Sequence, residues 1–139
     1  MEITFKEYFI SDNKKLMDID SIHSLLSNSY WAKNRSRDQI EKSIIYSHCY
    51  GVYFRKKQIG FARVITDYTT MYWLCDVFID EEHRNLGVGK KLVETITMSD
   101  EFKGITGLLV TKDAHELYEQ YHFQIDKEIE YMRRNPRKA

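Results

Sequence analysis

The chain has 139 residues, which allows one domain with a hydrophobic core but is too short for two ordinary domains. Hydrophobic residues make up 42% and charged residues 30%, a balance that excludes a disordered polymer of low hydrophobicity. The 21 Lys and Arg residues are matched by 21 Asp and Glu residues, so no global field draws the protein to nucleic acid or an anionic membrane. An anionic ligand therefore needs a local site.

The cysteine content and the apolar segments indicate where the protein works. Cys49 and Cys75 have no close-spaced partner of the kind that zinc or dithiol chemistry needs. The first nine residues carry charges where a secretory signal needs an apolar run. The longest uncharged stretch, residues 43–54, is well short of the roughly 20 apolar residues of a membrane helix. We expect a reduced, cytoplasmic protein with no membrane partner.

The first half of the chain is expected to form a strand, two helices and a hairpin. The strand covers Ile3–Ile10, and apolar residues at helical spacing predict a helix within Met17–Ser29. Ser36 and Gln39 have the spacing of a capping box, which predicts the start of a second helix. Two strands joined by the polar residues 55–58 then form the hairpin: Cys49–Phe54 and Ile59–Ile65.

The second half begins with an almost wholly apolar strand, Tyr72–Ile79, whose one charge is Asp76. A helix is expected to start near Gly87, followed by a strand over Ile105–Val110 and a short helix over Ala114–Tyr121. Two closing strands are expected, Phe123–Ile125 and Ile129–Met132. This order predicts one α/β domain over residues 1–139, with an early antiparallel sheet and a late crossover helix.

The junction between the apolar strand and the next helix has the features of an anion site. Free N–H groups at a helix start, next to glycines, allow an anion to approach the backbone closely. The spacing excludes a P-loop, because Gly87 and Gly89 are only one residue apart. It also excludes a dinucleotide fingerprint, because Leu92 stands where the third glycine is needed.

The segment Arg84–Gly89 fits Arg-x-x-Gly-x-Gly, which resembles the pyrophosphate-binding loop of the GCN5-related N-acetyltransferase (GNAT) superfamily of acyl-coenzyme A dependent enzymes. The stretch Thr111–Phe123 resembles the next motif of that family, with Ala, Leu, Tyr and Phe at the right intervals. Thr111 replaces the usual Asn, and His122 replaces the usual Gly. The resemblance implies a mixed central sheet with helices on both faces and splayed parallel strands near the coenzyme.

The resemblance also implies how acetyl-CoA binds. Its pantetheine arm would lie between Tyr72–Ile79 and Ile105–Val110, its pyrophosphate on the amides of Leu86–Lys90, and an N–H near Val77 would stabilise the oxyanion. An amine would attack the thioester directly, in a ternary complex and without a metal. The implied acetyl-CoA contacts are Val77, Phe78, Ile79, Arg84, Asn85, Leu86, Gly87, Val88, Gly89, Lys90, Thr111, Ala114 and Leu117.

Two residues are candidates for the proton transfers. By resemblance Tyr118 donates a proton to the departing thiolate; the alternative is that it only packs on the apolar face of its helix. Asp76 is a candidate base, because desolvation in an apolar strand would raise its pKa. A buried structural ion pair with Arg63 is the alternative for Asp76. His115 falls at the edge of its helix, where a surface position is expected.

The resemblance implies that the acceptor site lies at the connection between the first two helices. Trp31, Arg35 and Arg37 would form it together with Tyr72, and an arginine there would select a carboxylate or phosphate on the acceptor. The alternative is a solvated loop in which Trp31 fills the core.

The overall expectation is an acetyl-CoA dependent N-acetyltransferase that acts on a primary amine of a small molecule. A protein-lysine acetyltransferase and a non-catalytic acyl-CoA sensor are the alternatives. A homodimer is expected by resemblance, whereas the basic run Arg133–Lys138 is too short to indicate nucleic-acid binding. His23, His48, His83 and His122 form no metal-ligand spacing with one another.

Overall fold

The computed structural model describes residues 1–137 and contains one six-stranded sheet in the order β1-β2-β3-β4-β5-β6. Lys138, the last cation of the expected charged tail, lies outside the described residues. The strands are β1 (Glu2–Phe5), β2 (Tyr8–Ser11), β3 (His48–Phe54), β4 (Lys57–Thr66), β5 (Met71–Ile79) and β6 (Thr106–Leu108). The helices are α1 (Ile19–Ser27), α2 (Arg37–Ile45), α3 (Val88–Thr97) and α4 (His115–Glu119), with short 3-10 helices η1 (Lys14–Leu16) and η2 (Glu81–His83).

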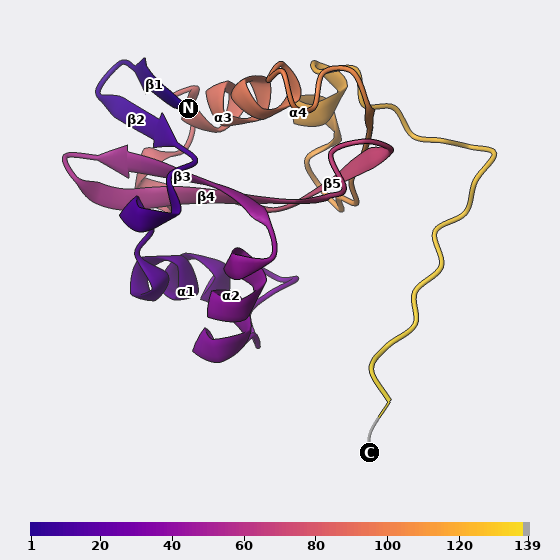
Figure 1. The fold of residues 1–139 in the computed structure, drawn as a ribbon, viewed down its shortest axis with the longest axis horizontal. Coiled ribbons are helices and arrows are strands. Elements are labelled where there is room, and N and C mark those ends of the chain that lie inside the picture. The colour runs from indigo at the N-terminus through magenta and orange to yellow at the C-terminus, as the bar shows by residue number, and fades with distance from the viewer. Residues whose placement is uncertain (138–139) are drawn as a thin grey trace.

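The sheet is mixed, as the sequence predicts. β1 to β5 pair antiparallel in chain order, and β6 pairs parallel to β5 after the crossover through α3. α1 and α2 cover one face of the sheet, whereas α3 and α4 lie on the other (Figure 1). Two clusters of buried apolar side chains fill these layers, one centred on Leu92 and Ile96 of α3 and one on Ile22 and Leu26 of α1. The expected single-domain α/β fold with helices on both faces is confirmed.

Short sequence motifs predict the starts of two helices, α2 and α3, correctly. The Ser36 hydroxyl accepts from the Gln39 amide at 3.1 Å, and the Gln39 side chain accepts from the Ser36 amide at 2.9 Å, which completes the capping box of α2. α3 begins at Val88, directly after Gly87, whose φ of 86° lies in the left-handed region. No helix among residues 1–137 has the length and apolar character needed to cross a bilayer.

The expected single strand over Ile3–Ile10 is wrong. The segment forms two antiparallel strands, β1 and β2, joined by a tight turn. Lys6 adopts a φ of 53° in that turn, and Lys6 and Glu7 are both exposed. Two consecutive charged residues at a solvated position thus break the strand and reverse the chain.

The two closing strands, Phe123–Ile125 and Ile129–Met132, are also wrong. Residues 123–132 join no strand of the described sheet, and Ile129 and Met132 are 71% and 91% exposed. β6 is only three residues long, so it offers few backbone groups for another strand to pair with. The chain beyond α4 therefore runs past β6 as an irregular segment and leaves the body of the protein (Figure 1).

Candidate active site

The parallel strands β5 and β6 separate along their length. Their pairing runs from Met71–Trp73 against Thr106–Leu108 and ends there, although β5 continues to Ile79. Beyond Trp73 the edge of β5 that faces away from β4 has no strand partner among the described residues. The expected splay is confirmed, and it leaves backbone donors and acceptors available to an extended ligand.

A β-bulge lies in the second half of β5. Phe61 of β4 faces Phe78, but Arg63 faces Cys75, so the strand has one extra residue between these pairs. Asp76, at the bulge, has a φ of 54°. A bulge redirects side chains, and this one points the Asp76 carboxylate toward the α1–α2 connection, as its contacts show.

The Asp76 carboxylate is buried and fully engaged. It accepts hydrogen bonds from Trp31 Nε1 at 2.9 Å, from an Arg35 guanidinium nitrogen at 2.6 Å and from Arg63 Nε at 2.8 Å. Burial alone would raise the pKa of Asp76, but the two guanidinium groups outweigh it and lower the pKa below its ordinary value. The expectation of a raised pKa is therefore wrong, and the structure shows the ion pair with Arg63.

The loop that follows β5 presents unpaired backbone donors. Asn85 and Gly87 both have positive φ angles, 64° and 86°, and the first helical hydrogen bond of α3 runs from the Lys91 amide to the Gly87 carbonyl. Within the described chain the amides of residues 85–90 donate no hydrogen bond. These free donors, at the positive end of α3, have the geometry that the predicted anion site requires.

Arg84 ties this loop to the end of β5. Its Nε donates to the Ile79 carbonyl at 2.9 Å, and its guanidinium lies 4.8 Å from the centre of the Phe78 ring. The expected coenzyme contacts thus surround the splay in three groups: Val77, Phe78 and Ile79 on β5, the loop and first turn from Arg84 to Lys90, and Thr111, Ala114 and Leu117 around the start of α4.

The β1–β2 turn also contributes to this loop, which the sequence did not predict. Lys6 Nζ donates to the Leu86 carbonyl at 2.9 Å, and a Cβ on Gly87 would lie 3.6 Å from the Phe5 ring. The charged pair after Phe5 signals a turn, but nothing in the sequence connects it to a loop 80 residues later. Lys6 thus brings a cation from another part of the chain to a loop that itself carries Arg84 and Lys90.

Tyr118 lies between the core and the splay. Its ring packs against the α3-side cluster and stands edge-on to Phe123, with 6.0 Å between ring centres. Its hydroxyl makes no hydrogen bond within residues 1–137, and burial raises its pKa to about 12. Thr111, in place of the family Asn, accepts from the Ala114 amide at 3.0 Å and orders the start of α4. His122 adopts a φ of 71°, so it keeps the turn that the family makes with glycine.

The α1–α2 connection crosses the splay from the other face. Trp31 stands edge-on to Tyr30, with ring centres 5.0 Å apart, and lies 6.1 Å from the ring of Phe78. The Tyr30 hydroxyl accepts from the Lys112 amide at 3.2 Å, which links the connection to the chain after β6. Trp31 and Arg35, two of the expected acceptor residues, thus lie beside the second half of β5.

The other two expected acceptor residues, Arg37 and Tyr72, make contacts outside the Asp76 network. Arg37 lies on the surface, where it pairs with Asp20 at 2.8 Å and with Glu41 at 3.4 Å, because its position at the start of α2 points it away from β5. Tyr72 is only 4% exposed, and its ring packs 4.9 Å from Phe102 in the core on the α3 side.

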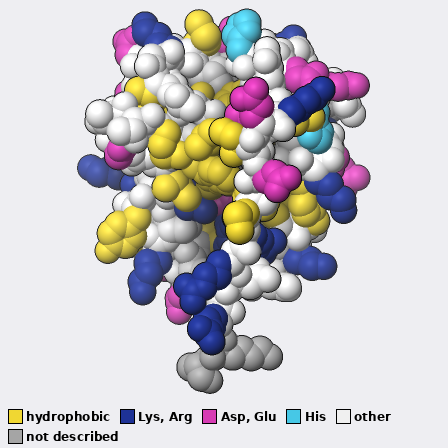
Figure 2. Space-filling view, turned by 90° about the vertical axis from the view of Figure 1, so that its right-hand side faces the viewer, with side chains coloured by type: hydrophobic (Ala, Val, Ile, Leu, Met, Phe, Trp, Pro, Cys, Tyr) yellow, Lys and Arg dark blue, Asp and Glu magenta, His cyan; other side chains and the backbone are white. Residues whose placement is uncertain are grey.

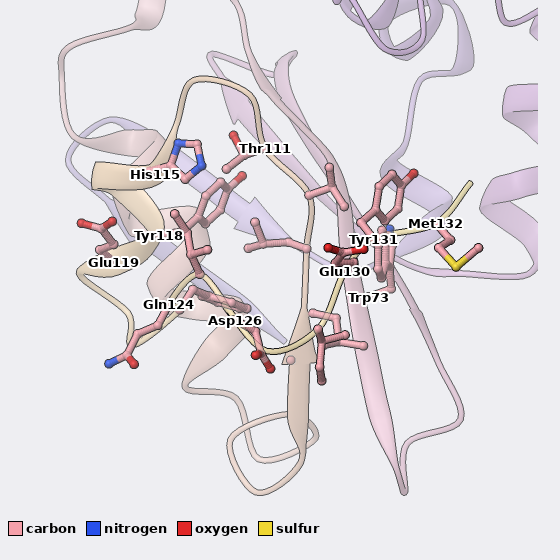
Figure 3. Close-up of a pocket in the computed structure, with 17 residues that line it drawn as sticks. Trp73, Thr111, His115, Tyr118, Glu119, Gln124, Asp126, Glu130, Tyr131 and Met132 are labelled. Carbon is pink, nitrogen blue, oxygen red and sulfur yellow. The ribbon is translucent and has the colours of Figure 1, made fainter. Parts of the chain in front are cut away.

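A cavity of about 570 Å³ opens beside Tyr118, between β6, α4 and the segment after α4 (Figure 3). Its wall includes His115, which is half-buried there and not on the open surface as expected. Within residues 1–137, no group of three or more His, Cys, Asp or Glu side chains is arranged to hold a metal ion.

Comparison with known proteins agrees with this geometry. The family described as acetyltransferase (GNAT) domain matches residues 46–125. FG08082 of Gibberella zeae, named provisionally as an acetyltransferase, is 26% identical over 110 residues, which cover 65% of this chain and 62% of that protein. The match therefore spans slightly less than two thirds of that relative.

Solved structures show the same architecture. A GNAT-family protein of Xanthomonas campestris pv. campestris, provisionally named an acetyltransferase, is 33% identical, covers 96% of each chain and has a TM-score of 0.87. A GNAT acetyltransferase of Elizabethkingia anophelis, solved with acetyl-CoA bound, is 16% identical and has a TM-score of 0.68, covering 88% of this chain and 80% of its own. From its sequence match, fold and loop geometry, this chain belongs to the GNAT acetyltransferase family.

Proposed function

We propose that this protein transfers the acetyl group of acetyl-CoA to a primary amine of a small molecule. The observation that carries the proposal is the free edge of β5, which leads directly into a loop with unpaired amides at residues 85–90. An extended pantetheine arm with a pyrophosphate at one end matches this arrangement, because strand-like hydrogen bonds and an anion site follow each other along one line. The residues present therefore fit acetyl-CoA.

The transfer is a direct displacement. The amine nitrogen bonds to the acetyl carbon, the carbon–sulfur bond breaks, and the amine proton passes to water. An N–H near Val77, on the free edge of β5, stabilises the oxyanion that forms on the way. Tyr118 donates the proton that the departing thiolate takes up, and a pKa of about 12 keeps that proton on the oxygen at neutral pH.

The contacts of Asp76 and of the α1–α2 connection indicate their roles. Asp76 accepts three hydrogen bonds and has a lowered pKa, so we assign it to the positioning of Trp31 and Arg35 and not to proton abstraction. This network fixes the α1–α2 connection over the splay, where it forms one wall of the acceptor site.

Cys49 and Cys75 are both free thiols, which supports the proposed cytoplasmic location. The homodimer stays a prediction.

A thiol-release assay tests the proposal. Purified protein is incubated with acetyl-CoA and with amines, polyamines, amino acids or lysine peptides, and free CoA is measured. We expect release that depends on a small amine and falls in Tyr118→Phe. Release with lysine peptides only would indicate a protein acetyltransferase. Binding of acetyl-CoA without release for any acceptor would indicate a sensor.

A further inference from the structure

The cavity beside Tyr118 has a distinctive chemical character. Apart from glycine and a few polar groups, its wall is made of apolar and aromatic side chains, among them Trp73, Leu108, Ile129 and Tyr131. Its acidic groups are the three carboxylates of Glu119, Asp126 and Glu130, and no Lys or Arg is among the described residues of its wall. Figure 2 shows hydrophobic side chains gathered at the middle of this face, with acidic side chains beside them. A volume of about 570 Å³ is in the range of small-molecule sites.

The cavity adjoins the gap between β5 and β6, where the acetyl group would be transferred. Its wall contains Leu109, Val110 and Thr111, which follow the last paired residue of β6 and therefore border the splay. In Figure 3, Thr111, His115 and Tyr118 lie at one end of the cavity, whereas Trp73 and Tyr131 lie at the other. The coenzyme loop, residues 84–90, contributes nothing to the wall. A ligand here would occupy space separate from the pyrophosphate.

The cations near the splay do not make this cavity positive. Arg35 and Arg63 are both bound to Asp76, and Lys112 Nζ lies 5.5 Å from the centre of the Tyr30 ring. Glu119, Asp126 and Glu130 are exposed around the cavity, so a carboxylate or phosphate that enters it would approach like charge, and no Lys or Arg of the described wall would compensate. The anionic acceptor expected from the arginines of the α1–α2 connection is therefore disfavoured by the cavity itself.

We infer that the acceptor is a cationic amine with an apolar or aromatic body, and that this body lies in the cavity between Tyr118 and Tyr131. The inference rests on the proposed transferase function and names its acceptor class. The carboxylates draw the ammonium form of the amine from solvent, and the faces of Trp73 and Tyr131 suit both an aromatic body and a cation. The amine reaches the Tyr118 end, where it loses a proton and attacks the thioester.

The test compares three amines that differ in one property each. 2-Phenylethylamine has the body and the cation, phenylalanine adds a carboxylate, and ethylamine lacks the body. Each is titrated by calorimetry into protein saturated with CoA, which has no acetyl group to transfer, so the readout does not depend on turnover. We expect 2-phenylethylamine to bind at least tenfold more tightly than either of the others. Equal or tighter binding of phenylalanine or ethylamine, or no binding of 2-phenylethylamine, overturns the inference.

Variants of the exposed segment after α4 locate the site without disturbing the sheet. Glu130→Gln and Tyr131→Ala should each weaken 2-phenylethylamine binding at least threefold and leave CoA affinity unchanged. Glu128→Gln is the matched control, since Glu128 carries the same charge on the same segment but is not part of the wall. Unchanged binding in both cavity variants, or an equal loss in the control, places the amine elsewhere and overturns the inference.

The acetyl-CoA assay separates this inference from the proposed function. If 2-phenylethylamine binds as expected but acetyl-CoA releases no thiol with it, the transferase function fails and the ligand class of the cavity stands. If thiol is released as efficiently with ethylamine or phenylalanine as with 2-phenylethylamine, the transferase function stands and the acceptor class is wrong.

Discussion

Gly89→Val tests the coenzyme loop, because the fold tolerates a side chain there and the bound pyrophosphate would not. Gly89 is the second residue of α3, and its amide precedes the first helical donor, Lys91. A Cβ at Gly89 would lie 3.5 Å from Ile79 Cγ1, an ordinary contact. Side chains in a helix tilt toward its N-terminus, so the valine methyl groups would extend over the unpaired amides.

The magnitude follows from the hydrogen bonds at risk. A hydrogen bond from an amide to a charged phosphate oxygen contributes about 1.5–3 kcal/mol, so the loss of one bond should weaken CoA binding about ten- to hundredfold. The free energy of unfolding should change by less than about 1 kcal/mol, since valine is no worse than glycine in a helix. Titration calorimetry with CoA and urea denaturation measure the two quantities.

Two other glycines sharpen this test. Gly104→Val is the control, because a Cβ at Gly104 meets no atom within 4 Å and the residue lies in the turn between α3 and β6; its CoA affinity should match the parent. Gly87→Ala should instead lower stability by about 1–2 kcal/mol, since Gly87 has a φ of 86°. A folded Gly89→Val protein with parental CoA affinity would refute the assignment of the loop.

Three predictions concern the rest of the site. Tyr118→Phe should lower kcat at least tenfold and leave acetyl-CoA affinity nearly unchanged in steady-state kinetics and calorimetry; normal turnover would make Tyr118 a packing residue. Asp76→Ala should lower the free energy of unfolding by about 3–5 kcal/mol in urea at pH 7, because it leaves two partly buried arginines without the carboxylate that they share. The Asp76 pKa lies below its ordinary value of 3.8, so the carboxylate stabilises the fold fully above pH 3.8 and loses this effect as the pH falls through the folded-state pKa. The difference in unfolding free energy between variant and parent should therefore shrink in acid, and a larger difference in acid would contradict the lowered pKa. Lys6→Ala should weaken CoA binding severalfold at low salt and less at high salt, whereas Lys56→Ala, at the β3–β4 turn, should not; equal effects would exclude a local role for Lys6.

Local features of the site could be predicted because they depend on contiguous residues. The capping box at Ser36 and the left-handed start of α3 at Gly87 are properties of four to six neighbouring positions. The apolar run Tyr72–Ile79 likewise indicates a strand with both faces covered, which β5 is. The anion loop follows from the same local logic, since a helix start with glycines exposes its own amides whatever surrounds it.

The sequence-based expectations were wrong for segments whose structure depends on a neighbouring strand. The alternating residues of Phe123–Met132 have strand propensity, but a strand forms only when a neighbour supplies its hydrogen bonds, and β6 is too short to do so. The turn at Lys6 has a local signal in two adjacent charges, yet its contact with Leu86 depends on the sheet that brings both segments to one edge.

The sequence by itself therefore determined the order of the elements from α1 to α4, the free amides of the loop before α3 and the position of Tyr118 on α4. The tertiary structure decided the charge state of Asp76 and the character of the cavity beside Tyr118. Burial raises a carboxylate pKa and cations lower it, so the sign depends on whether Arg35 and Arg63, from two other elements, reach the oxygens. The cavity wall likewise combines β5, β6, α4 and the segment after it, and only the folded chain brings those side chains together.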